Sequence, residues 1–131
     1  MAEPKTILLA DDEEQLALAM KIRLESKGYR VVIARDGQEA LRAAQQQKPD
    51  LVLLDVMMPV MDGYACLREF NTRFGRGVIP IIILTARDRM KDLFELEGIA
   101  DYVVKPFDHE DLASRIARAL QRPTPSKPST T

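Results

Sequence analysis

Apolar residues occur along the chain in five short runs, separated by segments with helical periodicity. The runs are predicted as strands over residues 6–10, 30–34, 51–56, 78–84 and 102–104. The run LVLLDV at 51–56 is apolar at every position except Asp55, which is typical of a strand buried on both faces of a parallel sheet. We therefore expect several strands of this chain to lie in the middle of a covered sheet.

The segments between these runs favour helices. Apolar residues recur every three or four positions from Glu14 until Gly28 supplies a stop, and this set includes Met20 and Ile22. Similar spacing predicts helices over 37–47 and 63–74, a short helix near 90–96 and a last helix over 109–121, which Asp108 is placed to cap. Five strands alternating with five helices predict an α/β fold in which right-handed crossovers cover both faces of a parallel sheet.

Composition narrows the class of protein. The chain has 131 residues, of which 46% are hydrophobic and 30% charged, as in a single globular domain. Nineteen Lys and Arg against 20 Asp and Glu give a net charge of -1, so no overall field favours nucleic acid or an anionic membrane. One cysteine, Cys66, excludes an internal disulfide, and no apolar run approaches the roughly 20 residues of a membrane helix. A cytoplasmic protein without membrane insertion is expected.

The two ends of the chain differ in character. The ordered domain is predicted over residues 1–121, and its first residues lack the basic and long apolar stretches of a signal peptide. The segment RPTPSKPSTT at 122–131 is rich in Pro, Ser and Thr and has no apolar periodicity. We expect this tail to be disordered.

Polar residues with chemical potential follow the predicted strands at their carboxyl ends. Asp11 and Asp12 follow the first strand, Asp55 ends the third, Thr85 follows the fourth and Lys105 follows the fifth. Ligands of open α/β sheets bind outside the carboxyl ends of the strands, so these side chains are expected to meet. Taken singly each has an ordinary interpretation, such as a helix cap for Asp12 or a surface charge for Lys105. Their joint placement carries the prediction of a site.

Three carboxylates at one sheet edge repel one another, so their convergence predicts a bound cation. All the predicted ligands are oxygens, with neither His nor Cys among them, which favours a hard ion such as Mg²⁺ and argues against zinc. Because Mg²⁺ commonly bridges carboxylates and phosphate oxygens, a phosphoryl group is the expected third component. Lys105 would pair with its negative charge.

Four segments, LLADDEE, LVLLDVMMPVMDG, IIILTA and DYVVKPF, resemble the signature segments of response-regulator receiver domains of bacterial two-component signalling. The likeness runs from about Thr6 to Leu120, with the segments in the order and near the spacing of that family. It implies a three-layer, doubly wound, flavodoxin-like fold with the strand order 2-1-3-4-5.

By matching positions, the resemblance also implies how the acidic residues act. Asp55 is the phosphoacceptor. Asp12 and Asp55 bind Mg²⁺ together with the backbone carbonyl of Met57, and Asp11 acts through a metal-bound water.

The remaining roles concern the phosphoryl group and the response to it. The resemblance implies that Thr85 and Lys105 bind the phosphoryl oxygens, and that the peptide bond between Lys105 and Pro106 is cis. It further implies a switch, in which Thr85 moves toward the phosphate and Tyr102 rotates inward.

The function implied is that of a signalling phosphoacceptor that catalyses only its own phosphorylation and dephosphorylation. The implied donor is a phosphohistidine of a histidine kinase or a histidine phosphotransfer protein. A downstream effector would bind the face formed by the fourth helix, fifth strand and fifth helix, and this chain would not itself bind nucleic acid. The stretch from Thr85 to Gly98 is shorter than in most receivers, so the fourth helix is expected to be truncated or displaced.

Other interpretations stay open at this stage. A phosphatase of the haloacid dehalogenase type also uses an aspartate and Mg²⁺, but Met57 stands where that class has a second acid. A receiver-like module that only binds partners is disfavoured by the presence of all five site residues. A flavodoxin relative is disfavoured because no Ser/Thr-rich loop follows the first strand. The Asp-Gly pairs at 36–37 and 62–63 are interpreted as turns or helix caps.

Overall fold

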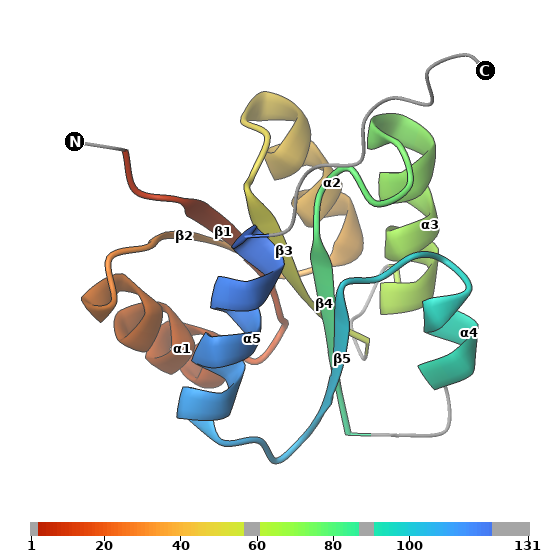
Figure 1. Ribbon diagram of the computed structural model, residues 1–131. Helices are drawn as coiled ribbons and strands as arrows, with labels where there is room; N and C mark the ends of the chain where they lie inside the picture. Colours follow the sequence, from red (N-terminus) through yellow and green to blue (C-terminus); the bar gives the residue numbers. More distant parts are fainter. Residues whose placement is uncertain (1–2, 57–60, 87–90, 122–131) are drawn as a thin grey trace.

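The structure, a computed structural model, contains one five-stranded parallel sheet with helices on both faces (Figure 1). It describes residues 3–56, 61–86 and 91–121. The predicted tail at 122–131 and Met57 lie outside the described residues. Within them the strands are β1 (Thr6–Ala10), β2 (Arg30–Ala34), β3 (Leu51–Asp55), β4 (Ile81–Thr85) and β5 (Asp101–Val104), and the helices are α1 (Glu14–Ser26), α2 (Gly37–Gln46), α3 (Gly63–Phe74), α4 (Lys91–Glu95) and α5 (His109–Gln121).

The strand order is β2-β1-β3-β4-β5, which confirms the doubly wound, flavodoxin-like prediction. Figure 1 shows α1 and α5 on one face of the sheet and α2, α3 and α4 on the other. Successive strand side chains point to opposite faces, so Ile7 and Leu9 pack with α1 and α5 while Leu8 and Ala10 pack with α2 and α3. The continuous apolar runs therefore supply two cores, one on each side of the sheet.

One element boundary differs from the predicted one in an informative way. The fourth strand begins at Ile81 and not at residue 78, because the backbone N–H of Val78 donates to Gly75 O in a turn and Pro80 has no N–H to donate. Helix α4 covers Lys91–Glu95 within the described residues, and residues 87–90, directly before it, lie outside them.

Helix α1 shows which of its apolar residues face the sheet. Ala17, Met20 and Leu24 are buried against it, whereas Leu18 and Ile22 are 52% and 60% exposed. The apolar set predicted from spacing included Ile22, and the structure places that residue in solvent. Ala17, Met20 and Leu24 follow the three- and four-residue spacing of a single helical stripe, and a helix can press only one such stripe onto a sheet.

The register of the sheet aligns the carboxyl ends of its strands. Ala10 pairs with Leu54, Asp55 with Leu84 and Thr85 with Val104. The residues that end or follow β1, β3, β4 and β5 consequently lie at one edge. This edge carries the five polar residues predicted to meet there, which are Asp11, Asp12, Asp55, Thr85 and Lys105.

Candidate functional site

Three carboxylates meet at the carboxyl edge of the sheet. Asp11 and Asp12 follow β1 and Asp55 is the last residue of β3; one carboxylate oxygen from each lies within 4.8 Å of the others. Asp11 and Asp55 are 0% and 3% exposed, whereas Asp12 is exposed to solvent. The site thus has two buried acids and one acid at its mouth.

Within the described part of the chain, only one of the two carboxylate oxygens of Asp11 accepts a hydrogen bond. Its backbone N–H donates to Ala34 O at 3.0 Å, and its Oδ1 accepts from the backbone N–H of Glu13 at 2.9 Å. Its Oδ2 is buried and has no hydrogen-bond partner among the described residues. Burial raises the pKa of Asp11 to about 6; the hydrogen bond from Glu13 and the charge of Lys105 oppose that rise, and the nearby Asp55 adds to it.

Lys105 supplies positive charge to this edge. Its Nζ lies 3.3 Å from Asp55 Oδ2 and 3.9 Å from Asp11 Oδ2. The backbone N–H of Lys105 donates to the carbonyl of Thr85 at 2.7 Å, so the ends of β4 and β5 are tied together. The Lys105–Pro106 peptide bond is cis, as the resemblance implies. Thr85 is 1% exposed and lies at the same edge.

The donor set fits a divalent cation. Three carboxylates within reach of one ion provide several oxygens, and Asp11 Oδ2, which accepts no hydrogen bond among the described residues, is free to accept one from a bound water or to ligate a cation. Because the cluster holds neither His nor Cys, the donors suit a hard ion better than zinc.

The structure tests one of the two interpretations of Asp12, that of a helix cap. Helix α1 begins after Glu13 and has no side-chain cap, so Asp12 does not cap it. The local backbone contact is made instead by Asp11. Caps are found where the sequence analysis expected them elsewhere: Asp36 and Asp62 accept from the third residue beyond them at the starts of α2 and α3.

Tyr102 belongs to an aromatic cluster that the sequence did not predict. Its ring lies 6.0 Å from that of Phe94 in α4, which lies edge-on to the ring of Tyr64 in α3 at 5.5 Å. The Tyr64 hydroxyl donates to Glu97 Oε2 at 3.2 Å, and burial together with this carboxylate raises the pKa of Tyr64. The signal in the sequence was three aromatic residues on separate elements, but nothing in their spacing showed that they meet.

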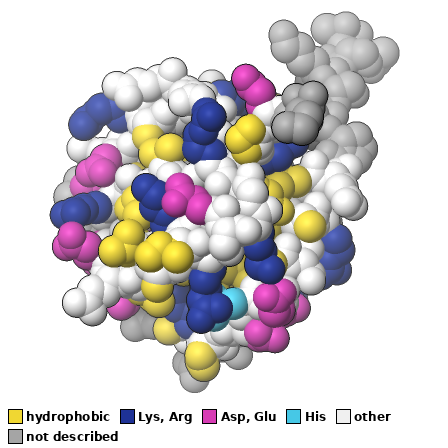
Figure 2. Space-filling view, turned by 90° about the vertical axis from the view of Figure 1, so that its left-hand side faces the viewer, with side chains coloured by type: hydrophobic (Ala, Val, Ile, Leu, Met, Phe, Trp, Pro, Cys, Tyr) yellow, Lys and Arg dark blue, Asp and Glu magenta, His cyan; other side chains and the backbone are white. Residues whose placement is uncertain are grey.

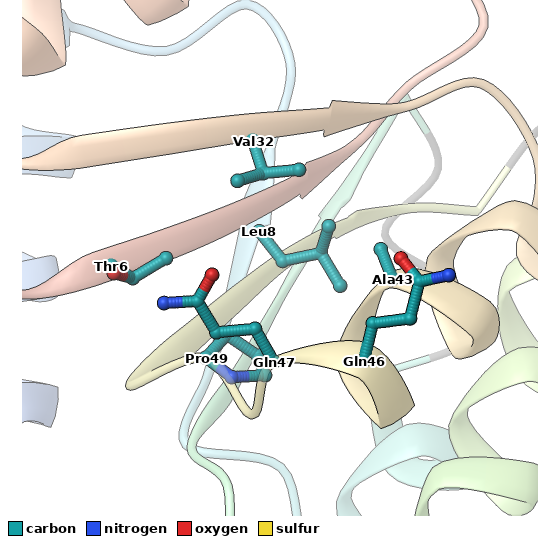
Figure 3. A pocket seen from close by; sticks show the side chains of 7 residues that line it. All are labelled: Thr6, Leu8, Val32, Ala43, Gln46, Gln47 and Pro49. Carbon is teal, nitrogen blue, oxygen red and sulfur yellow. The ribbon is translucent and has the colours of Figure 1, made fainter.

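A separate pocket lies away from this site. It has a volume of about 220 Å³ between the strands β1 and β2 and the end of α2 (Figure 3). Leu8 and Val32 from the strands and Ala43 and Gln46 from the helix are among its walls, which contain no ionisable side chain. The pocket therefore contributes no chemistry to the acidic edge.

The fold and the site together define a class: a small doubly wound α/β domain with a cluster of three carboxylates, two of them buried, at the carboxyl edge of its sheet. A family model for the response regulator receiver domain matches residues 7–117. The chain belongs to this family of two-component signalling proteins, whose members are phosphoacceptors.

Curated relatives support the same assignment. The alkaline phosphatase synthesis transcriptional regulatory protein PhoP of Bacillus subtilis is 39% identical over 127 residues, which are 95% of this chain and 52% of that protein. A probable transcriptional regulator, ycf27 of Cyanophora paradoxa, is 46% identical over 131 residues, covering 96% of this chain and 54% of that protein. The chain thus spans about half the length of these relatives.

Solved structures agree with the fold. The receiver domain of the Francisella response regulator 1452 superimposes with a TM-score of 0.82 at 32% identity, covering 90% of this chain and 98% of that one. The receiver domain of the sensor histidine kinase PA1611 of Pseudomonas aeruginosa, described with a magnesium ion coordinated in its active-site cleft, has a TM-score of 0.82 at 33% identity, covering 91% and 99%. Within the described residues, none of the helices has the length and hydropathy that a transmembrane span requires.

The raised pKa of Asp11 generates a prediction for the metal-free protein. Because the folded-state pKa of about 6 exceeds the ordinary value of 3.8, the folded protein binds more protons than the unfolded one between these pH values, and stability falls as pH rises through them. Asp11→Asn removes the buried charge, so it should raise the free energy of unfolding at pH 7.5 by about 1–3 kcal/mol. The gain should shrink at pH 4.5. Urea unfolding in EDTA measures both values, and an equal gain at the two pH values would contradict this account.

Proposed function

We propose that Asp55 accepts a phosphoryl group from a phosphohistidine of a histidine kinase or a histidine phosphotransfer protein, with Mg²⁺ bound, and that the chain then changes conformation. The observation that carries this proposal is the arrangement of Asp55, which is buried at the sheet edge among two other carboxylates with Lys105 Nζ 3.3 Å from its Oδ2. The protein fixes the orientation of the Asp55 carboxylate and places the positive charge of Lys105 beside it, and phosphoryl transfer depends on both.

The transfer is a displacement at phosphorus. A carboxylate oxygen of Asp55 forms the new O–P bond while the P–N bond to the donor imidazole breaks, and the electron pair of that bond returns to the imidazole nitrogen. Lys105 offsets the negative charge of the transferring group, which its position beside both buried acids allows. The chain thereby catalyses its own phosphorylation and, with water as the attacking group, its own dephosphorylation.

Asp12 and Asp55 would hold Mg²⁺, together with the carbonyl of Met57 that the resemblance implies, while Asp11 acts through a metal-bound water. The ion would supply positive charge against the phosphoryl oxygens. Two observations support this assignment: Asp11 Oδ2 accepts no hydrogen bond among the described residues, and the donor set consists of oxygens only.

The response to phosphorylation would begin with Thr85, whose hydroxyl binds a phosphoryl oxygen alongside Lys105. Tyr102 is already buried, at 8% exposure, with its ring beside that of Phe94. Movement of Thr85 would let the ring turn further inward from this position, and its contact with Phe94 would pass the change to α4. We assign the output to the face of α4, β5 and α5, where Leu96 and Val104 are 70% and 39% exposed. A downstream effector would bind there, and the chain itself would make no contact with nucleic acid.

The donor would approach along α1. This helix starts at Glu14, two residues after Asp12, and it exposes Leu18 and Ile22 one turn apart. Figure 2 shows this side of the molecule, where hydrophobic side chains lie among charged ones. An apolar pair of this kind beside the acidic edge suits a helical donor domain that presents its histidine to Asp55. A cytoplasmic location, where such donors carry their phosphohistidine, belongs to the same proposal.

Replacing the acceptor provides the first test. Asp55→Asn should abolish labelling by acetyl phosphate in Mg²⁺, because an amide does not attack phosphorus as a carboxylate does. Asp36→Asn and Asp62→Asn are matched controls, since Asn caps a helix about as well as Asp and both proteins should still be labelled. Intact-protein and peptide mass spectrometry locates the group, and its appearance on Asp36 or Asp62 would refute the assignment.

Metal binding provides the second test. Asp12→Ala removes a direct carboxylate ligand, so the Kd for Mg²⁺ should rise at least tenfold in calorimetric titration. Asp11→Ala should raise it less, because Asp11 acts through water. Equal Kd values for the wild type and Asp12→Ala would remove Mg²⁺ from this site.

Donor docking provides the third test. Leu18→Glu combined with Ile22→Glu should slow transfer from a phosphorylated histidine phosphotransfer protein at least tenfold, while labelling by acetyl phosphate stays at the wild-type rate. Leu96→Glu is the control, since Leu96 is exposed on a different face. Both rates are measured on the same preparations, and an equal loss with both donors would show that α1 is not the docking surface.

A further inference from the structure

The Asp-Gly pairs at 36–37 and 62–63 each start a helix. Asp36 Oδ1 accepts from the backbone N–H of Glu39 at 2.8 Å, and Asp62 Oδ1 accepts from that of Ala65 at 2.9 Å. The capping roles explain the aspartates but not the glycines that follow them. The glycines with positive φ among the described residues are Gly28, Gly75, Gly77 and Gly98, so backbone conformation does not require glycine at 37 or 63.

Space requires glycine at 63. Its backbone N–H donates to Val56 O at 3.0 Å, which draws the first turn of α3 onto the end of β3. A methyl group added at Gly63 would lie 2.6 Å from Val56 Cα and 2.9 Å from the carbonyl oxygen of Asp55. Both atoms belong to the backbone that carries the acceptor, and neither can rotate away as the end of a side chain can. Carbon atoms in contact lie about 3.5–4.0 Å apart, so β3 or α3 would have to move by roughly 1 Å.

That movement would disturb the acidic edge. The other side of the same backbone is fixed to β4, because the N–H of Val56 donates to Leu84 O at 3.1 Å, and Leu84 is followed by Thr85. The end of β3 is therefore clamped between α3 and β4, and a push from residue 63 shifts Asp55 relative to Lys105, whose Nζ is 3.3 Å from it. A misplacement of about 1 Å in a reacting group is sufficient to cost roughly a hundredfold in rate.

We propose that Gly63 is a positioning residue for phosphoryl transfer. The absence of a side chain there lets α3 pack directly on the backbone of Asp55 and Val56, and this contact holds the Asp55 carboxylate in its position relative to Lys105. This inference rests on the proposed function of Asp55. It assigns to Gly63 an effect on the rate of the folded protein, which differs from a contribution to stability alone.

The experiment compares Gly63→Ala with Gly37→Ala. Gly37 is also buried and also follows a capping aspartate, but a methyl group there would meet Met61, 2.8 Å from its Cβ and 2.9 Å from its carbonyl oxygen, and not the backbone of Asp55. Labelling by phosphoramidate is followed at saturating Mg²⁺, at 10 °C and in trimethylamine N-oxide, which favours the folded state. The folded fraction is measured by circular dichroism in the same samples, and each rate is divided by it. Ala44→Gly, a buried change in α2, provides a destabilised reference.

Gly63→Ala should lower the maximal rate per folded molecule at least tenfold, while Gly37→Ala and Ala44→Gly should stay within about threefold of the wild type. A merely structural role would lower the folded fraction and leave this rate unchanged. A wild-type rate in folded Gly63→Ala, or an equal loss in Gly37→Ala, would overturn the inference. Failure of the wild type to be labelled on Asp55 would instead refute the proposed function, so the two failures are distinguishable.

Discussion

Asp11 and Asp55 have lost almost all contact with water, and yet they lie side by side at the carboxyl edge of the sheet. Burial raises the free energy of each charge, and their mutual repulsion raises it further. Lys105 relieves part of this cost at 3.3 and 3.9 Å, but one oxygen of Asp11 keeps no hydrogen-bond partner in the described structure. The metal-free site thus carries an electrostatic cost. A divalent cation bound there would remove part of this cost, so cation binding would also raise the stability of the fold.

The rest of the fold keeps these acids where they are. Helices on both faces exclude water from the sheet, and parallel pairing brings the ends of β1, β3, β4 and β5 to the same level. Backbone hydrogen bonds from Asp11 to Ala34, from Val56 to Leu84 and from Lys105 to Thr85 extend the ladder to the site itself. Because rigid elements carry the charges, the repulsion between the acids is not released by local rearrangement.

The opposite side of the acceptor strand links the site to α3 and α4. Gly63 presses α3 onto the end of β3, and the next residue, Tyr64, packs against Phe94, which in turn contacts Tyr102. Helix α3 also holds the segment after α4, since Asn71 Nδ2 donates to the carbonyl of Glu97 at 2.7 Å. Helix α4 and the segment after it are therefore tied to α3 by aromatic packing and hydrogen bonds. A change in the position of Tyr102 would alter the packing of both α3 and α4.

Hydrophobic pattern and polar spacing determined the alternation of strands and helices and the set of acids at one sheet edge, because those features are local in the chain or follow from parallel pairing. The family was indicated by the resemblance of four sequence segments to its signature. Only the tertiary structure decided that Ile22 faces solvent, that Asp11 and not Asp12 is the buried acid with the local backbone contact, and that Gly63 lies against the acceptor backbone. Burial and close approach depend on which element covers a residue from elsewhere in the chain. Asp11 and Asp12 are neighbours with the same side chain, so the sequence does not distinguish them. Their burial differs only because β2 and β3 pack beside Asp11 in the folded chain and leave Asp12 in solvent.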